Sequence, residues 1–368
     1  MKLLSCEIKN FRNIVDTSAV FSEGVNVING DNAEGKTSIL EAVYVFARGR
    51  SFRTNKESEF INFEAESSRI SIEYSDIRRM SKMTAEYDRH DSRKLYKNGV
   101  RILKTSEFIG NFRAVLFTPD HLSLIKDAAS ERRLFLDIAM AQITPQYVQY
   151  IKKYNSLLSQ RNALLKNGNA GSNENLILFE TLAEQMAQYA ANITRLREKY
   201  CAKLSEKVSG YIDEMSGGRE KAELKYEVCI TDDISQITDT KQTAKLYYKK
   251  LTENLEREIY FKTSLYGPQK DDIDIKLNGN SSRKYCSQGQ QRSLALALKL
   301  AEGDISNEVT GEYPVYLLDD VLGELDGRRA EFFMSHLQGK QIIITSCDAY
   351  EKIKNADRII TVKNGEVL

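Results

Sequence analysis

The chain has 368 residues, of which 41% are hydrophobic, and its formal net charge is +1. This near-neutral balance excludes a global attraction to nucleic acid or membranes, so any such affinity must come from local patches. The longest apolar runs are too short to span a bilayer, no secretory leader follows Met1, and the five cysteines form no CxxC pair. These features predict a cytoplasmic protein with reduced thiols and no membrane partner.

A phosphate-binding loop stands near the start of the first segment, residues 1–120, which is rich in predicted strands. Gly30–Thr37 reads GDNAEGKT, with a predicted strand, Val25–Asn29, before it and a predicted helix, Ser38–Ala47, after it. The glycines let the backbone approach phosphate oxygens, and the loop amides and the helix start attract negative charge. Lys36 is expected to reach the β- and γ-phosphates and to assist catalysis, and the Thr37 hydroxyl to hold Mg²⁺. The loop residues predicted to bind ATP are Gly30, Asp31, Asn32, Ala33, Glu34, Gly35, Lys36 and Thr37.

Basic residues gather after this helix and in the strand-rich region that follows. Residues 78–104 alone hold nine lysines and arginines against three acidic residues. Such clusters suit non-specific contact with DNA phosphates, although a solvated, charge-rich hairpin would have the same composition. No base-reading motif accompanies them, so the expected binding is independent of DNA sequence. The predicted DNA contacts are Arg50, Arg53, Lys56, Arg78, Arg79, Arg93, Lys94 and Lys97.

The middle segment, residues 121–261, changes to long helices. Hydrophobic residues recur at steps of three or four from Phe179 to Met215, which predicts a coiled-coil seam of roughly 60 Å. A Gly/Asn/Ser-rich linker, residues 167–175, separates it from a preceding helix with an apolar face. The short linker predicts that the two helices pack as an antiparallel hairpin. A helical lobe is therefore expected to interrupt an α/β domain that resumes at residue 262.

The last segment, residues 262–368, carries the acidic half of a nucleotide site. Val315–Leu318 is an apolar run that predicts a buried strand, and it ends in Asp319 and Asp320. Asp319 is placed to hold the Mg²⁺ shell, and Asp320 is placed to orient or deprotonate the attacking water. The alternative interpretation is that the two acids cap a turn.

A second helix start in this segment also suits an anion. Ser287 is a good N-cap for the helix that begins with Gln288 and Gly289. Two phosphate-binding helix starts in one chain predict that two protomers sandwich ATP. The loop of one protomer would then meet Ser287, in trans, and its two neighbours Gln288 and Gly289. Glu324–Asp326 is expected to lie at the dimer contact.

Together these motifs resemble those of ABC-type ATPases, in the branch that contains SMC and Rad50 proteins. Over nearly its whole length the chain is similar to the RecF family of bacterial DNA-repair proteins. The matching segments are Asn10–Asn13, Ser51–Thr54, Thr118–Asp120, Gly30–Thr37, Ser287–Glu302 and Leu317–Asp320. The resemblance implies an α/β ABC-type ATPase head with an inserted all-helical lobe containing a short antiparallel coiled coil. It also implies that Arg12 and Asn13 lie near the nucleotide.

The same resemblance implies a function in DNA replication, recombinational repair and the SOS response to DNA damage. The expected activity is weak, DNA-stimulated hydrolysis of ATP with Mg²⁺. An ATP-dependent homodimer would bind duplex DNA or a single-strand/duplex junction and help RecO and RecR load RecA at single-strand gaps. Two alternatives stay open: an SMC/Rad50-type chromosome-maintenance ATPase and, least favoured, the nucleotide-binding subunit of an ABC transporter.

Three residues depart from the expected pattern. Gln269 stands where the family often has histidine, and Thr345 and Ser346 stand where ABC transporters carry a switch histidine. A hydroxyl can hydrogen-bond the γ-phosphate but is a poor proton acceptor, which fits slow hydrolysis.

Overall fold

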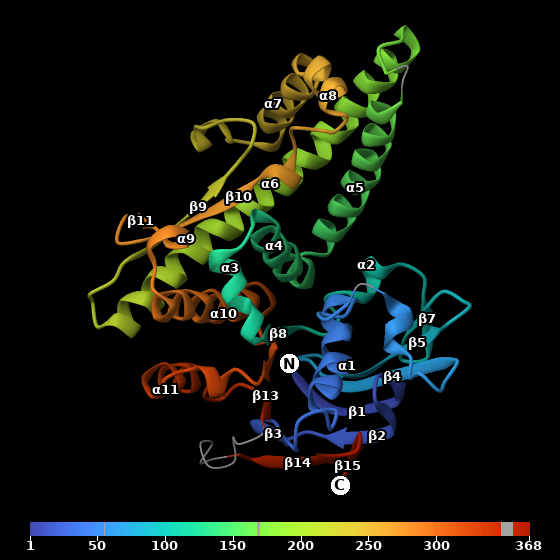
Figure 1. Cartoon of the computed structure of the whole chain (residues 1–368), viewed down its shortest axis with the longest axis vertical. Coiled ribbons are helices and arrows are strands. Elements are labelled where there is room, and N and C mark those ends of the chain that lie inside the picture. The colour runs from blue at the N-terminus through green and yellow to red at the C-terminus, as the bar shows by residue number, and fades with distance from the viewer. Residues whose placement is uncertain (55, 168–169, 347–355) are drawn as a thin grey trace. The chain divides into compact units, whose positions relative to one another are not determined.

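The computed structural model describes residues 1–54, 56–167, 170–346 and 356–368 (Figure 1). The chain divides into two compact units. The first unit comprises residues 1–122, 141–143 and 288–368, and the second comprises residues 123–140 and 144–287. The division expected from sequence, with boundaries after residues 120 and 261, differs from this one mainly at the second boundary.

One layer of the first unit is an antiparallel sheet of six strands. Its strands are β1 (Lys2–Phe11), β2 (Ile14–Val20), β4 (Ser67–Ser75), β5 (Met80–Asp88), β6 (Lys94–Lys97) and β7 (Val100–Ile102), in the order β2-β1-β4-β5-β6-β7. The β6–β7 hairpin turns at Asn98 and Gly99, whose φ angles are 51° and 79°. An Asn-Gly pair favours this turn because both residues tolerate positive φ.

The other sheet of this unit is parallel except for its last edge strand, β15. Its strands are β3 (Val25–Asn29), β8 (Ala114–Phe117), β12 (Val315–Asp319), β13 (Ile342–Ser346), β14 (Arg358–Lys363) and β15 (Glu366–Val367), in the order β15-β14-β3-β13-β12-β8. β8 and β12 are buried along their whole length, and for β12 the apolar run Val315–Leu318 predicts this burial. Because β3, β12 and β13 run parallel, their carboxyl ends meet at one edge of the sheet.

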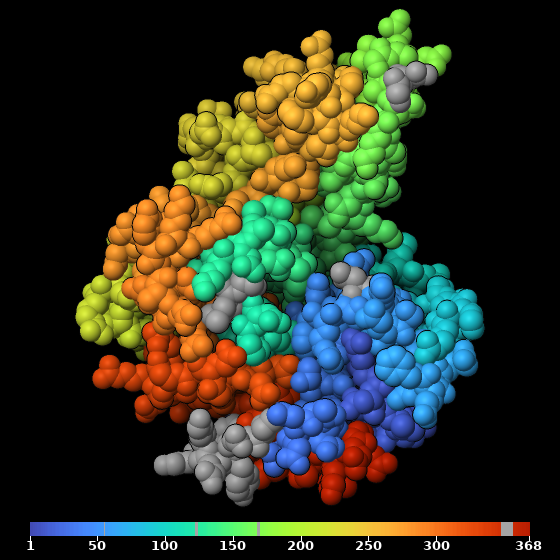
Figure 2. Space-filling view, viewed as in Figure 1, coloured from blue at the N-terminus to red at the C-terminus, as the bar shows by residue number. Residues whose placement is uncertain are grey.

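Helix α1 (Lys36–Arg48) contacts strands of both sheets and is buried along almost its whole length. This position explains why eight of the nine residues from Ile39 to Ala47 are apolar, the exception being Glu41. The other helices of this unit are α2 (Thr105–Phe108), α10 (Gln288–Thr310) and α11 (Gly327–His336). In the space-filling view, the C-terminal end lies against the N-terminal strands, where the Val367 amide donates to the Thr17 hydroxyl (Figure 2).

The second unit is built on a helical hairpin. Its helices are α3 (Ser123–Lys126), α4 (Ala129–Ile143, whose last three residues fall in the first unit), α5 (Pro145–Lys166), α6 (Asn173–Ser216), α7 (Thr240–Glu253), α8 (Leu255–Phe261) and α9 (Ser282–Tyr285). The 44 residues of α6 correspond to about 66 Å of helix. It packs along α5, which runs in the opposite direction (Figure 1). The structure thus has the predicted fold class, an ABC-type head with an inserted helical lobe that contains a short coiled coil.

A small sheet explains why the second unit extends past residue 261. Strand β9 (Ala222–Glu227) pairs with β10 (Asp272–Leu277), which in turn pairs with β11 (Asn280–Ser281). The Arg132 side chain also donates to both carboxylate oxygens of Asp272, at 2.7 and 2.9 Å. Strand pairing over such a sequence separation leaves no local signal, so the predicted boundary falls too early.

Polar side chains are buried in the loop before β10. The Asp271 carboxylate accepts hydrogen bonds from the Tyr226 hydroxyl, at 2.5 Å, and from the Cys229 amide, at 3.0 Å. Burial raises the pKa of Asp271 above its ordinary value. Gln269 accepts a hydrogen bond from the Tyr154 hydroxyl at 2.5 Å. These contacts give Gln269 a structural role within the second unit.

Across the described part of the chain, no helix is both long enough and apolar enough to cross a bilayer.

Candidate nucleotide-binding site

The loop between β3 and α1 has the geometry of a phosphate-binding loop. Gly35 caps α1 with φ 108°, a conformation that favours glycine. Lys36 Nζ donates to the carbonyl oxygens of Gly30, at 2.7 Å, and Asp31, at 2.8 Å. A Cβ on Gly30 would lie 2.4 Å from the carbonyl oxygen of Val362, so this position also requires glycine. The predicted residues thus form one turn around the Lys36 ammonium group.

Neighbouring segments hold this loop in place. Asn13 Nδ2 donates to the Ala33 carbonyl at 3.1 Å, and the Asn13 side-chain oxygen accepts from the Ser38 hydroxyl at 2.8 Å. On the other side, the Glu34 carboxylate and carbonyl accept from the backbone amides of Asn364 and Gly365. The Glu34 side chain is therefore turned toward the β14–β15 hairpin.

Arg12 is anchored by a buried carboxylate, Glu41, that no sequence motif marks. Arg12 Nε and Nη2 donate to the two oxygens of Glu41, at 3.1 and 2.6 Å. The Glu41 carboxylate also accepts from the Ser51 hydroxyl and lies 3.4 Å from Arg53 Nη1. A bidentate pair fixes the plane of the Arg12 guanidinium, so both arginines are held by one residue of α1.

The acidic pair, Asp319 and Asp320, lies beside the phosphate loop and the end of β13. Asp319 ends β12 and is buried, and its Oδ1 accepts from the hydroxyls of Thr37, at 2.9 Å, and Thr345, at 2.7 Å. Burial raises the pKa of Asp319 above its ordinary value. Asp320 is exposed and adopts a left-handed φ of 55°, which an aspartate tolerates better than most residues.

These oxygens fit a hard cation. Mg²⁺ takes oxygen ligands, and the Thr37 hydroxyl and the Asp319 carboxylate stand within hydrogen-bond distance of each other. The pair would hold the cation beside the phosphate loop, where it would screen phosphate charge. Thr345, in contrast, is buried and has its hydroxyl on Asp319 and on the Asp320 amide. Thr345 is one of the two residues that stand where a switch histidine is expected, and its hydroxyl is engaged on the two aspartates.

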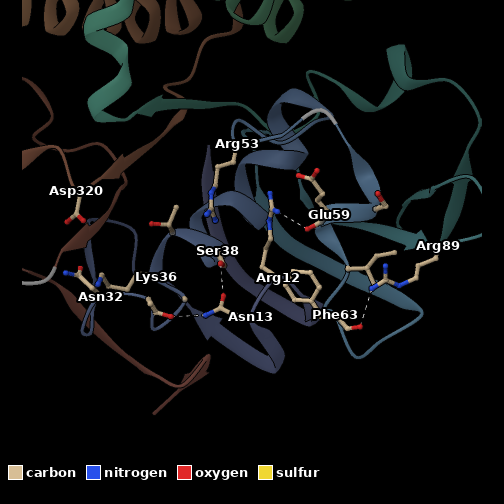
Figure 3. Close-up of a pocket in the computed structure, with 15 residues that line it drawn as sticks. Arg12, Asn13, Asn32, Lys36, Ser38, Arg53, Glu59, Phe63, Arg89 and Asp320 are labelled. Carbon is tan, nitrogen blue, oxygen red and sulfur yellow. Dashed lines mark hydrogen bonds between the residues drawn. The ribbon is translucent and has the colours of Figure 1, made fainter.

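A cleft of about 790 Å³ extends from the phosphate loop across the first unit. Figure 3 shows Lys36, Asn32 and Asp320 at one end of the cleft and Phe63 and Arg89 at the other. The residues that line it are Arg12, Asn13, Asn32, Ala33, Gly35, Lys36, Thr37, Ser38, Arg53, Ser58, Glu59, Ile61, Phe63, Arg89 and Asp320. No local motif marks the far end of the cleft, from Ser58 to Arg89, so the sequence did not predict it.

The predicted second anion site stands at the start of α10. Ser287 and Gln288 are exposed there, and neither Gln288 nor Gly289 is among the described residues that line the cleft. A Cβ on Gly289 would lie 3.0 Å from Arg329 Nη2. Arg329 is paired with Asp326, which caps α11, so part of the expected dimer-contact loop has a local structural role.

The predicted DNA contacts do not form one surface. Arg78 and Arg79 are exposed in the β4–β5 turn, whereas Arg93 and Lys94 lie at the other end of the β5–β6 pair, about 20 Å away. Arg93 is also engaged, because its guanidinium donates to Glu57 at 2.6 Å and to the Gly49 carbonyl at 2.7 Å. The remaining predicted contacts are the exposed Arg50, the half-exposed Arg53, Lys56 beside Glu59, Lys94 beside Asp91 and Lys97 beside Asn111.

The RecF/RecN/SMC N terminal domain family model matches residues 2–367. The DNA replication and repair protein RecF of Ruminiclostridium cellulolyticum is 37% identical over 92% of this chain and 90% of its own length. The corresponding RecF of Clostridium novyi is 34% identical over 100% of this chain and 99% of its own length.

The chain belongs to the RecF family.

Solved RecF structures have the same fold. The structure of the recombination mediator protein RecF-ATPrS in the RecFOR pathway has a TM-score of 0.92 at 34% identity, covering 99% of this chain and 97% of that one. The corresponding RecF-ATP structure has a TM-score of 0.91 at 33% identity, covering 100% and 97%. An Smc head bound to the C-winged helix domain of ScpA has a TM-score of 0.56 at 17% identity. At this identity, the similarity concerns the fold alone.

Proposed function

We propose that this chain is an ATP-dependent DNA-binding clamp in recombinational repair. Two copies dimerise on duplex DNA or on a single-strand/duplex junction, through two composite ATP sites. The dimer then helps RecO and RecR load RecA at single-strand gaps. ATP hydrolysis is weak, is stimulated by DNA and releases the clamp.

The observation that carries the ATP-binding part is the convergence of distant motifs on one cleft. Lys36 and Thr37 come from the phosphate loop, and Asp320 directly follows β12. Lys36 Nζ, which contacts two loop carbonyls, would transfer its donors to phosphate oxygens. The RecF-ATP and RecF-ATPrS relatives support the same ligand.

The slow hydrolysis has a chemical reason in this proposal. Asp320 would accept a proton from the attacking water, and its side chain is one methylene shorter than the glutamate that many ABC-type ATPases use. No histidine lines the cleft in the part of the chain that the structure describes. General-base catalysis by a carboxylate with this shorter reach is expected to be weak.

The dimer would be completed in trans by Ser287, which is exposed just before α10 and would meet another protomer's nucleotide. DNA binding is assigned to exposed arginines, first of all Arg78 and Arg79. Backbone contacts of this kind read no sequence and weaken as salt rises.

The test compares DNA affinity with and without ATP–Mg²⁺ for the wild-type protein and Ser287→Arg. The wild type should bind duplex DNA more tightly with ATP, whereas Ser287→Arg should bind ATP normally but lose this gain. Equal gains in both proteins would contradict the composite site. No gain in the wild type would contradict ATP control of DNA binding.

A further inference from the structure

We propose that Thr345 is a positioning residue for ATP hydrolysis, which couples the Asp319 carboxylate to the backbone of Asp320. The inference rests on the proposed ATPase function and deepens it. It adds a residue of β13 that belongs to neither the phosphate loop nor the acidic pair.

The hydroxyl of Thr345 sits between the two aspartates. Thr345 is 1% exposed and lies opposite Asp319 in the parallel β12–β13 register. Its Oγ1 donates to Asp319 Oδ1 at 2.7 Å and accepts from the Asp320 amide at 3.1 Å. A hydroxyl has one proton and two lone pairs, so it can form both bonds at once. The Leu318 carbonyl, at 3.5 Å, is too distant to compete for the proton.

Each bond fixes one of the two acids. Asp319 Oδ1 also accepts from Thr37 at 2.9 Å, so two hydroxyls converge on one oxygen and set the rotation of this carboxylate. Asp320 has a left-handed φ of 55°, and the bond from its amide to Thr345 holds that conformation. The Asp320 side chain lines the cleft from this backbone.

Thr345 itself is not among the described residues that line the cleft, so it must act through the two aspartates. Removing its hydroxyl would leave the Asp319 carboxylate held by Thr37 alone and would leave the Asp320 amide without this acceptor. The protein would then bind Mg²⁺ more weakly and would position the attacking water less well. Contacts of the nucleotide with the phosphate loop would not change.

The test uses Thr345→Val, which keeps the shape and removes the hydroxyl, and Thr345→Ser, which keeps the hydroxyl. Thr361→Val, an exposed threonine on β14 of the same sheet, is the matched control. Three quantities are measured on the full chain: ATP affinity without Mg²⁺, the Mg²⁺ concentration that half-saturates Mg²⁺-dependent ATP binding, and kcat with KM. Thermal unfolding of each variant shows whether the protein stays folded, and Thr345→Ala replaces valine if it does not.

Thr345→Val should lower kcat about tenfold or more, because the loss of a hydrogen bond to a charged group is of that order. It should raise the half-saturating Mg²⁺ concentration several-fold and leave Mg²⁺-free ATP affinity and KM nearly unchanged. Thr345→Ser should keep a kcat and a half-saturating Mg²⁺ concentration close to those of the wild type.

Wild-type kcat and Mg²⁺ half-saturation in Thr345→Val would overturn the inference. Equal loss in the serine and valine variants would also overturn it, because it would trace the effect to the methyl group. A wild-type protein that binds ATP without hydrolysing it would instead contradict the proposed ATPase activity, and the Mg²⁺ titration would still decide the role of Thr345.

Discussion

Thr37 donates a hydrogen bond to Asp319 across 2.9 Å, although 282 residues separate them in sequence. The bond joins the start of α1 to the end of β12. It brings the phosphate loop and the acidic pair to the same edge of the parallel sheet. The candidate nucleotide site is therefore assembled from N-terminal and C-terminal segments of the first unit. Substitutions in either segment should affect the binding and hydrolysis of ATP.

Lys36→Ala should reduce ATP affinity by about 100-fold or more, because it removes the charge-assisted donor of the phosphate loop. Titration with a fluorescent ATP analogue measures the loss. Lys56→Ala is the matched control, since Lys56 is an exposed lysine that does not line the cleft. Equal affinities of Lys36→Ala and the control would show that this loop is not the nucleotide site.

The buried pair of Arg161 and Glu258 should matter greatly for the stability of the second unit. Both side chains are fully buried, and Arg161 Nε and Nη2 donate to Glu258 Oε2 at 3.0 and 2.8 Å. Glu258→Gln should lower the free energy of unfolding by about 3 kcal/mol or more, because it leaves a buried arginine without its counter-charge.

Urea unfolding followed by circular dichroism measures this change. Glu253→Gln is the control, because Glu253 pairs with Lys249 on the exposed surface of α7. Its effect should stay below about 0.5 kcal/mol. Similar losses in the two variants would contradict a special role for the buried pair.

Reversing the charges of Arg78 and Arg79 to glutamate should weaken DNA binding and leave ATP affinity unchanged. Each lost phosphate contact should also reduce the slope of log affinity against log salt by about 0.9. Fluorescence anisotropy with a labelled duplex at several salt concentrations measures both quantities. The control is Lys9→Glu, an exposed charge reversal on β1. If the double variant binds DNA as tightly as the Lys9→Glu control, the β4–β5 turn is not part of the DNA-binding surface.

Asp271 should make the stability of the second unit depend on pH. Burial raises its pKa in the folded state, while the unfolded chain titrates near the ordinary value of 3.8. Above pH 3.8 the folded state therefore keeps its proton longer than the unfolded state, and the contribution of Asp271 to stability falls as the pH rises through this window.

Asp271→Asn cannot titrate, so the difference in unfolding free energy between wild type and variant should decrease from pH 4 toward neutrality. Urea unfolding of both proteins across this range measures the difference. A stability difference that stays constant or grows with pH would contradict the raised pKa.

The sequence predicted the parts of the site that are continuous in the chain. Gly30–Thr37 and the acids after Leu318 carry their chemistry in local patterns, and the structure brings them together. The anchoring of Arg12 by Glu41 joins two elements 29 residues apart, and nothing in the local sequence marks that contact. Composition also cannot separate a solvated arginine such as Arg78 from one held by internal partners.

The expected boundary after residue 261 differs from the observed end of the second unit at residue 287 for a related reason. β10 belongs to the second unit because it pairs with β9, and only the register between the two strands reveals this. Periodicity located the long helices well, since an apolar seam is a repeated local signal. Long-range pairing has no such repeat.

The most direct test of the clamp is the mass of the protein in solution, with and without ATP–Mg²⁺ and with and without duplex DNA. Asp320→Asn should slow turnover and retain ATP, so that the nucleotide-bound state persists during sedimentation. The protein should be a monomer without ATP and a dimer with ATP–Mg²⁺, and duplex DNA should strengthen this dimer. A protein that stays monomeric with bound ATP, in the presence and absence of DNA, would contradict the central claim.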